Sequence, residues 1–309
     1  MRLFKIAICL IAVHLIFSVQ NVNAQYYYNY GRGYGESEIT FELGASGGIM
    51  NGMTDIGGSK KGKANVGFMN DFTLNNTKLN GGIYFAGTYR DVLAIRLEAN
   101  VGQVAATDSS LKGTTDAYAL GRYDRNLSFK SNIINANAIM EFHPLFIKSY
   151  TDEDPPRFSP YVLAGVGYTK YNPQANLNGY WYDLQSLKLE GNGFPEYADR
   201  KEFKTSAVTV PFGVGLRYDL GPLVNLRLEF VRYWMDTDYL DGAHYGDWVD
   251  PSLFYRYLNP GNAAVAVQLY NRSTTVNPPR DTRPRANEKN NDTFWTFNFK
   301  IGYKFNRRQ

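Results

Sequence analysis

Few side chains in this sequence could act as general acids, bases or nucleophiles. Beyond the first 24 residues the histidines are His143 and His244, and the single cysteine of the chain is Cys9. A general base must lie within hydrogen-bond reach of the group whose proton it takes. The strands that the sequence pattern predicts place His143 and His244 at opposite ends of the fold, and neither comes beside a serine–acid pair. We therefore predict that the protein is not an enzyme.

Five aspartates fall within a short stretch near residue 240. They are Asp236, Asp238, Asp241, Asp247 and Asp250. Carboxylates at such spacing could hold calcium, and Gly242 could supply a turn, but the stretch does not match the EF-hand loop pattern. A solvated, tyrosine-rich loop is the favoured alternative, so we predict no metal and no cofactor and leave calcium binding as an open question.

A second group of charges lies on the polar faces of apolar strands. Its members are Arg96, Glu98, Arg217, Arg227, Glu229 and Lys300. Inside a soluble barrel such charges would be costly unless they were paired. A membrane barrel inverts the arrangement, because its apolar face meets lipid and its polar face lines the interior. We predict that these six side chains form an internal charge network that fills a narrow barrel.

The stretch from Thr205 to Met235 shows this pattern most clearly. Apolar residues alternate with small or polar ones on both sides of a Gly221-Pro222 turn. Period-2 alternation around such a turn predicts a β-hairpin. Each arm has about the ~9–11 residues with which a tilted strand crosses a bilayer.

Six further strands follow from the same alternation, over residues 38–49, 79–89, 93–101, 127–142, 160–171 and 295–305. Inside 127–142 the apolar parity changes, which predicts a β-bulge near Ser131–Ile133. Long loops (51–76, 107–125, 172–203 and 236–291) alternate with short or medium connections. Outer-membrane barrels have short periplasmic turns and long external loops. The fold class is therefore all-β: an eight-stranded antiparallel transmembrane β-barrel with long external loops.

The N-terminus predicts export. Basic residues precede an apolar run that is too short to span a bilayer, and a small-x-small pattern ends at Ala24, before Gln25. We predict a signal peptide over 1–24, a Tyr/Gly-rich periplasmic tail over 25–36 and the barrel over 37–309. The 33 basic and 29 acidic residues of the chain nearly balance, so we expect no nucleic-acid partner. The predicted location is the outer membrane of a Gram-negative bacterium, with its lipid as surroundings.

Several segments together resemble a known family. They are N-L-S-F-K-S-N-I-I (126–134), P-Y-V-L-A-G-V-G-Y (160–168), Y-N-P-Q-A (171–175), W-Y-D-L-Q-S-L-K-L-E-G-N-G (181–193), V-P-F-G-V-G-L-R-Y (210–218) and T-D-Y-L-D (237–241). In these segments the sequence resembles the PorG family of the Bacteroidetes type IX secretion system. The resemblance covers about the second half of the barrel and the strand at 127–142.

The resemblance implies a non-enzymatic outer-membrane component of protein export. Its expected partner is the periplasmic ring complex, built from a lipoprotein and a soluble protein, which it would anchor to the membrane. The candidate partner face consists of Arg90, Asp91, His143, Asp219, Arg307 and Arg308. The alternative is a small barrel whose external loops bind a surface ligand, as an adhesin or a glycan-binding protein would. A lipid-modifying enzyme is disfavoured by the scattered histidines, and no small-molecule substrate is evident.

Overall fold

A computed structural model describes residues 39–58, 76–147, 156–273, 285–286 and 290–305. The predicted signal peptide, its cleavage site at Ala24 and Gln25, and the tail over 25–36 lie outside the described residues. Arg307 and Arg308 of the candidate partner face also lie outside them.

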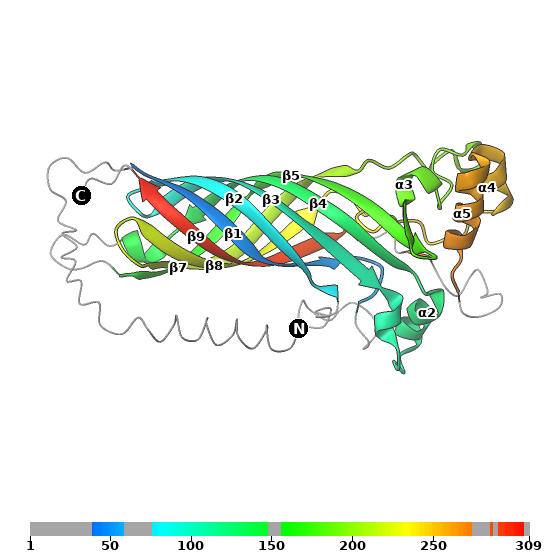
Figure 1. Ribbon diagram of the computed structural model, residues 1–309, viewed down its shortest axis with the longest axis horizontal. Helices are drawn as coiled ribbons and strands as arrows, with labels where there is room; N and C mark the ends of the chain where they lie inside the picture. Colours follow the sequence, from blue (N-terminus) through cyan, green and yellow to red (C-terminus); the bar gives the residue numbers. More distant parts are fainter. Residues whose placement is uncertain (1–38, 59–75, 148–155, 274–284, 287–289, 306–309) are drawn as a thin grey trace.

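Eight antiparallel strands close into a barrel (Figure 1). The strands are β1 (Ile39–Met53), β2 (Lys78–Tyr89), β3 (Leu93–Thr107), β4 (Ser128–Phe142), β5 (Phe158–Leu177), β7 (Ser206–Asp219), β8 (Val224–Met235) and β9 (Thr293–Phe305). The hydrogen-bonded order runs β4-β3-β2-β1-β9-β8-β7-β5, and a β4–β5 pairing joins the two ends. The prediction of an eight-stranded antiparallel barrel is confirmed.

The wall of the barrel is apolar on its outside. Along β3, Leu93, Ile95 and Leu97 point outward and are at least 44% exposed, whereas the alternate residues Ala94, Arg96 and Glu98 are buried. The barrel strands share this alternation, because successive side chains in a strand point to opposite faces. Aromatic side chains are exposed at the end where β1 begins; they are Tyr89, Phe142, Phe158, Tyr218, Tyr303 and Phe305. Among the helices of the described residues, none is long and apolar enough to cross a bilayer.

The predicted β-bulge near Ser131–Ile133 is wrong. β4 pairs with β3 in one continuous register from Leu93↔Phe142 to Thr107↔Ser128, and its burial alternates without a break. Phe129 and Ile133 point inward, on the same face of β4 as Asn135, Asn137 and Glu141 nearer the periplasmic end. The apparent change of parity arises because the inside of the barrel is itself apolar at this end, so both faces of β4 carry apolar side chains.

The two ends of the barrel differ in size. One end has the chain start of β1, the β2–β3 turn at Arg90-Asp91, the β7–β8 turn and a connection that contains η3 (Pro144–Ile147). By the rule that periplasmic turns are short, this is the periplasmic end. The opposite, external end carries η2 (Asp108–Leu111), α2 (Ala117–Arg125), β6 (Tyr180–Asp183), α3 (Leu184–Leu187), η4 (Pro195–Tyr197), α4 (Ser252–Tyr257) and α5 (Pro260–Tyr270).

These external elements replace what the sequence pattern predicted as loops. β5 does not end at Tyr171 but continues to Leu177, where it turns back into β6. Beyond it, α3, η4, α4 and α5 enclose an apolar core of their own, which we call the cap core (right side of Figure 1). It consists of Ala175, Leu184, Leu187, Leu189, Phe194, Val249, Phe254, Ala263, Ala266, Leu269 and Tyr270. We call this part of the molecule the cap.

Local signals explain the longest helix of the cap. The Asn259 side chain accepts a hydrogen bond from the backbone N–H of Asn262 at 2.8 Å and so caps the start of α5. Pro260 follows at the first helical position, where its missing N–H costs nothing. The helix can therefore start inside a loop although its own sequence is apolar on nearly all sides.

Candidate functional site

The half of the lumen nearer the periplasmic end is filled by paired charges. Arg96 donates to Glu229 through both terminal nitrogens, at 2.5 and 3.0 Å. Lys300 contacts Glu229 at 2.8 Å and Glu98 at 2.5 Å. The charges of β3, β8 and β9 therefore meet inside the lumen, and each contact joins a cation to a carboxylate. A planar guanidinium that meets a carboxylate with two parallel bonds gives the strongest pairing of this kind.

A second set of contacts extends this group toward the periplasmic end. Arg227 contacts Glu42 at 2.9 Å and Glu141 at 2.7 Å. Glu141 also contacts Arg96 at 2.5 Å, so the two guanidinium groups share it. We call the seven residues Glu42, Arg96, Glu98, Glu141, Arg227, Glu229 and Lys300 the central ionic cluster. All of them are buried.

Two tyrosines donate hydrogen bonds to two of the carboxylates. The Tyr84 hydroxyl donates to Glu42 at 2.5 Å, and the Tyr161 hydroxyl donates to Glu229 at 2.5 Å. Buried charges are tolerated only where partners satisfy them, since removing them from water is expensive. The cluster is therefore a polar core that fills the lumen.

Four of the six predicted interior charges, Arg96, Glu98, Glu229 and Lys300, thus lie in direct contact, and Arg227 joins them through Glu141. The sixth, Arg217, lies closer to the periplasmic end. It contacts Asp91 at 3.3 Å and Asp219 at 3.5 Å, and Lys304 contacts Asp219 at 2.9 Å. These pairs form a separate layer at the periplasmic end.

Sequence reasoning missed Glu42, Glu141 and the two tyrosines. The signal for Glu141 was present, because the alternation that places Met140 and Phe142 outward places Glu141 inward. Tyr84 falls between the outward Ile83 and Phe85 in the same way. Tyr84 and Tyr161 both point into the lumen, where their hydroxyls donate to carboxylates.

The candidate partner face needs correction. His143 is completely buried, stacked on Tyr161 at 4.6 Å between ring centroids, and Asp219 is buried in its ion pairs. Neither can contact a partner, because each side chain turns into the lumen. Arg90 is exposed and Asp91 is half-buried against Arg217.

His143 does meet a serine and an acid, which the strand map did not foresee. Its Nδ1 lies 3.3 Å from the Ser159 hydroxyl and its Nε2 lies 3.2 Å from Glu141. The sequence map missed this because it placed Ser159 in the connection before residue 160, whereas β5 begins at Phe158 and lies beside the neighbouring β4. Glu141 is already shared by two arginines, and all three side chains are buried. The arrangement therefore belongs to the packing of the lumen.

Toward the external end the charges are followed by a layer of buried amides and hydroxyls that includes Asn100, Asn135 and Thr169, and beyond this layer the lumen becomes apolar. Buried side chains from several strands and from the loop after β8 meet there; they include Met50, Val104, Phe129, Ile133, Tyr171, Tyr233, Met235, Leu240 and Phe294. Tyr233 and Phe294 stack with 4.5 Å between ring centroids. We call this group the apolar plug. Together with the central ionic cluster it fills the barrel from the periplasmic end to the cap.

A barrel with charges inside and a continuous apolar wall outside is stable only where lipid covers the wall. The protein is an outer-membrane β-barrel. The predicted location in the outer membrane of a Gram-negative bacterium is thereby confirmed.

No protein-family model and no curated protein sequence matches this chain. Solved structures do resemble it. Neisserial surface protein A is 10% identical to this chain, with a TM-score of 0.35. The match covers 88% of this chain and 99% of the neisserial protein. The attachment invasion locus protein Ail of Yersinia pestis, in complex with the heparin analogue sucrose octasulfate, has the same identity and TM-score. The match covers 88% of this chain and 100% of Ail. The outer membrane protein OprG from Pseudomonas aeruginosa is 11% identical to this chain, with a TM-score of 0.37. The match covers 88% of this chain and 98% of OprG.

The five aspartates of the last external loop go to different partners. Asp247 contacts Arg200 at 2.5 Å, Asp238 contacts His244 at 2.8 Å, and Asp241 accepts the backbone N–H groups of Ile56 and Ala243. Asp236 and Asp250 accept from backbone N–H groups at 2.8 and 2.9 Å. In the parts of the chain that the structure describes, no three acidic, histidine or cysteine side chains gather so that they could hold a metal ion.

Two carboxylates at the external mouth are buried close to one another. Burial raises the pKa of Asp241 to about 7, and the neighbouring Asp55 adds to the rise. Burial also raises the pKa of Asp292, with Asp241 as the next cause. Both carboxyl groups accept backbone N–H groups of the loops at the external end of the lumen.

Proposed function

We propose that this barrel is a non-conducting anchor: a non-enzymatic component of the type IX secretion system that holds the periplasmic ring complex, a lipoprotein with a soluble partner, at the outer membrane. The observation that supports the proposal is the filled lumen. Since the central ionic cluster and the apolar plug occupy it, the barrel offers its ends rather than its interior. The resemblance of six sequence segments to the PorG family supports the export system in particular.

The periplasmic end carries a surface suited to a partner. Arg90 is exposed at the tip of the β2–β3 turn. Leu145 and Ile147 in η3 are 40% and 65% exposed, and Leu220 in the β7–β8 turn is 55% exposed. These four side chains form the revised partner face of the proposal, in place of the buried His143 and Asp219.

The experiment is deletion of the gene, followed by measurement of type IX cargo in the medium and in the periplasm. We expect cargo to disappear from the medium and to accumulate inside, and the wild-type gene to restore secretion. A variant with Ile147→Asp and Leu220→Asp should not restore it, because charges on the partner face disfavour an apolar interface. Tyr255→Ala in the cap is the control and should restore secretion fully. Normal secretion after deletion would refute the proposal.

The cap favours a second candidate, recognition of an external ligand. Its own apolar core makes it a folded platform, and large aromatic side chains stand out from it: Tyr180 is 72% exposed, Trp181 44% and Tyr255 62%. Exposed aromatics on a rigid scaffold are typical of binding surfaces. In the same deletion strain, loss of attachment with normal secretion would select this candidate. The variant Tyr180→Ala with Tyr255→Ala would then fail to restore attachment, whereas Ile147→Asp with Leu220→Asp would restore it.

A further inference from the structure

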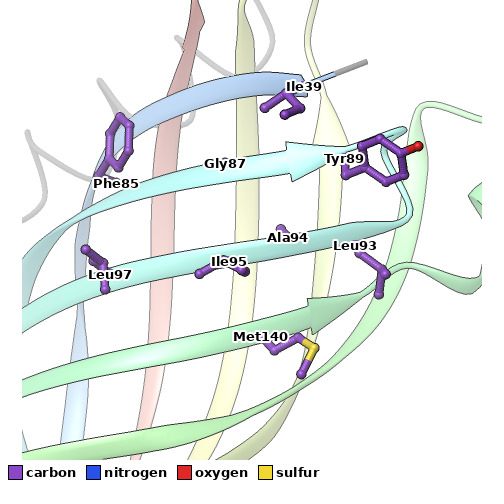
Figure 2. A pocket seen from close by; sticks show the side chains of 9 residues that line it. All are labelled: Ile39, Phe85, Gly87, Tyr89, Leu93, Ala94, Ile95, Leu97 and Met140. Atoms are coloured by element: carbon purple, nitrogen blue, oxygen red, sulfur yellow. The ribbon is translucent and has the colours of Figure 1, made fainter.

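The lipid-facing wall carries an apolar groove of about 480 Å³ on the outside of β1 to β4, near the periplasmic end (Figure 2). Its lining comes from these four strands and includes Phe85, Gly87, Tyr89, Ile95 and Met140. We call it the wall groove.

The strand register explains the hollow. One row of outward positions runs Phe41, Gly87, Ile95 and Met140 across four paired strands. In the rows on either side, β2 contributes Phe85 and Tyr89 instead. Gly87 thus leaves a notch between two aromatic side chains, and the larger side chains of β3 and β4 form the opposite wall (Figure 2). A cross-strand row normally fills its face, so the notch is a local feature of β2.

A cation stands at the lower end of this notch. The Arg90 guanidinium lies 5.1 Å from the centre of the Tyr89 ring, and Tyr89 lines the groove. Arg90 and Asp91 have φ values of 51° and 56°, which fixes a tight turn. Asp91 points to Arg217 in the lumen, at 3.3 Å. The turn therefore directs the Asp91 carboxylate into the lumen, whereas the Arg90 guanidinium lies outside the lumen, beside the exposed ring of Tyr89.

We propose that the wall groove is a binding site for one phospholipid of the periplasmic leaflet. An acyl chain lies in the notch at Gly87 against Phe85, Ile95 and Met140, and the phosphate pairs with Arg90. The depth fits, because an apolar channel that ends at a cation and a tyrosine hydroxyl matches the order of chain and headgroup in a leaflet. The charge fits as well, since a guanidinium binds phosphate oxygens through paired N–H groups. The inference goes beyond the anchor function and does not depend on it.

The test is lipid titration of the purified mature protein in detergent micelles, followed by native mass spectrometry. The probes are dipalmitoylphosphatidylethanolamine, dipalmitoylglycerol, which lacks the phosphate, and glycerol phosphate, which lacks the chains. We expect the wild type to retain one phospholipid, to bind dipalmitoylglycerol more weakly, and not to bind glycerol phosphate. Binding of glycerol phosphate alone would overturn the proposal, because the site would then be for a free anion.

Two variants test the two halves of the site. Gly87→Leu fills the notch; a Cβ there would meet the Phe41 ring at 3.4 Å, an ordinary contact, so the strand need not shift. It should weaken phospholipid binding by about tenfold, which corresponds to the loss of roughly two buried methylene groups. Arg90→Asn keeps a residue that tolerates positive φ and removes the charge. It should also weaken phospholipid binding by about tenfold but leave dipalmitoylglycerol binding unchanged.

Matched controls exist on the same barrel. Gly47 also faces outward from a strand, and a Cβ on it would meet nothing within 4 Å. Arg157 is an exposed arginine at the start of β5. Gly47→Leu and Arg157→Asn should bind as the wild type does. Equal losses in Gly87→Leu and Gly47→Leu would refute the proposal, as would a change in dimer fraction, rather than in bound lipid, when Gly87 is replaced.

Discussion

The barrel lumen and the cap have cores of opposite chemistry. The lower lumen is built from arginines, lysines and glutamates, whereas the cap core holds Leu187, Phe254 and Leu269 among other apolar side chains. The two regions belong to one chain and are joined by β5. What differs is their surroundings, since lipid covers the barrel wall and water covers the cap. The barrel therefore exposes apolar side chains to lipid and buries charged ones, whereas the cap exposes polar side chains to water and buries apolar ones.

The two cores should also fail differently. A polar core depends on complete pairing, so the loss of one ion affects several partners at once. An apolar core depends on volume, so the loss of one ring leaves a cavity whose cost depends on how far the neighbours relax. Three substitutions or conditions test this contrast.

The largest effect is expected for Arg96→Met. This guanidinium contacts Glu98, Glu141 and Glu229, so its removal leaves three buried carboxylates without their common partner. We expect the barrel to lose about 3–5 kcal/mol of its free energy of unfolding, the usual cost of breaking a buried ion pair on one side. Urea unfolding in detergent micelles, followed by gel mobility, measures it. Leu97→Met on the lipid-facing side of the same strand should change little.

A compensating substitution sharpens this prediction. Adding Glu229→Gln to Arg96→Met removes one of the stranded carboxylates and should recover part of the lost stability. If Arg96→Met and Glu229→Gln each unfold at the wild-type urea concentration, the central ionic cluster is not the core of the barrel and the comparison fails.

A smaller and more local effect is expected for Phe254→Ala. The ring is buried in the cap core and meets Tyr270 edge-on, with 5.5 Å between ring centroids. We expect the cap to lose about 3 kcal/mol, from lost burial and the cavity that remains. Hydrogen exchange should speed up in α4 and α5 while the urea midpoint of the barrel stays constant. Tyr255→Ala, next to it but exposed, is the control. A parallel drop in barrel stability would show that the two cores fold as one.

The smallest effect concerns pH. The pKa of Asp241 is raised by burial to about 7, above its ordinary value of 3.8. Between these two values the unfolded loop releases its proton and the folded loop keeps it, so the stability of the external mouth falls as pH rises from about 4 to about 7. Asp292, whose pKa is also raised, acts in the same direction. The protection factors of residues 237–243, which compare the observed exchange rate with the intrinsic rate at the same pH, should therefore be larger at pH 5 than at pH 8, and Asp241→Asn should flatten the dependence. Smaller protection factors at pH 5 would contradict this account.

The sequence predicts the barrel well because successive side chains of a strand point to opposite faces of the sheet. Arg227 and Glu229 sit between Leu226, Leu228 and Phe230, and each set points to its own side. The same rule misleads where both sides are apolar. Phe129 looks like a lipid-facing residue in the sequence, but it belongs to the apolar plug.

The cap could not be predicted in this way. α5 is apolar around most of its circumference, so it lacks the one-sided stripe that marks a helix, and Pro260 suggests a loop. The burial of His143 was also out of reach, because His143 follows the last residue of β4 and its contact with Ser159 depends on the connection between β4 and β5. Alternation within one strand does not encode contacts that form where a strand ends.

One consequence of the long β5 is mechanical. The strand runs from Phe158 at the periplasmic end to Leu177 in the cap, and it is paired with β4 over Val162–Gln174 and with β7 over most of its lower part. A pull on the cap would load these backbone hydrogen bonds lengthwise, in shear, so many of them would have to break together. A pull that peeled the strand sideways would break them one after another. The cap is therefore held to the barrel by a tether that resists tension along the membrane normal.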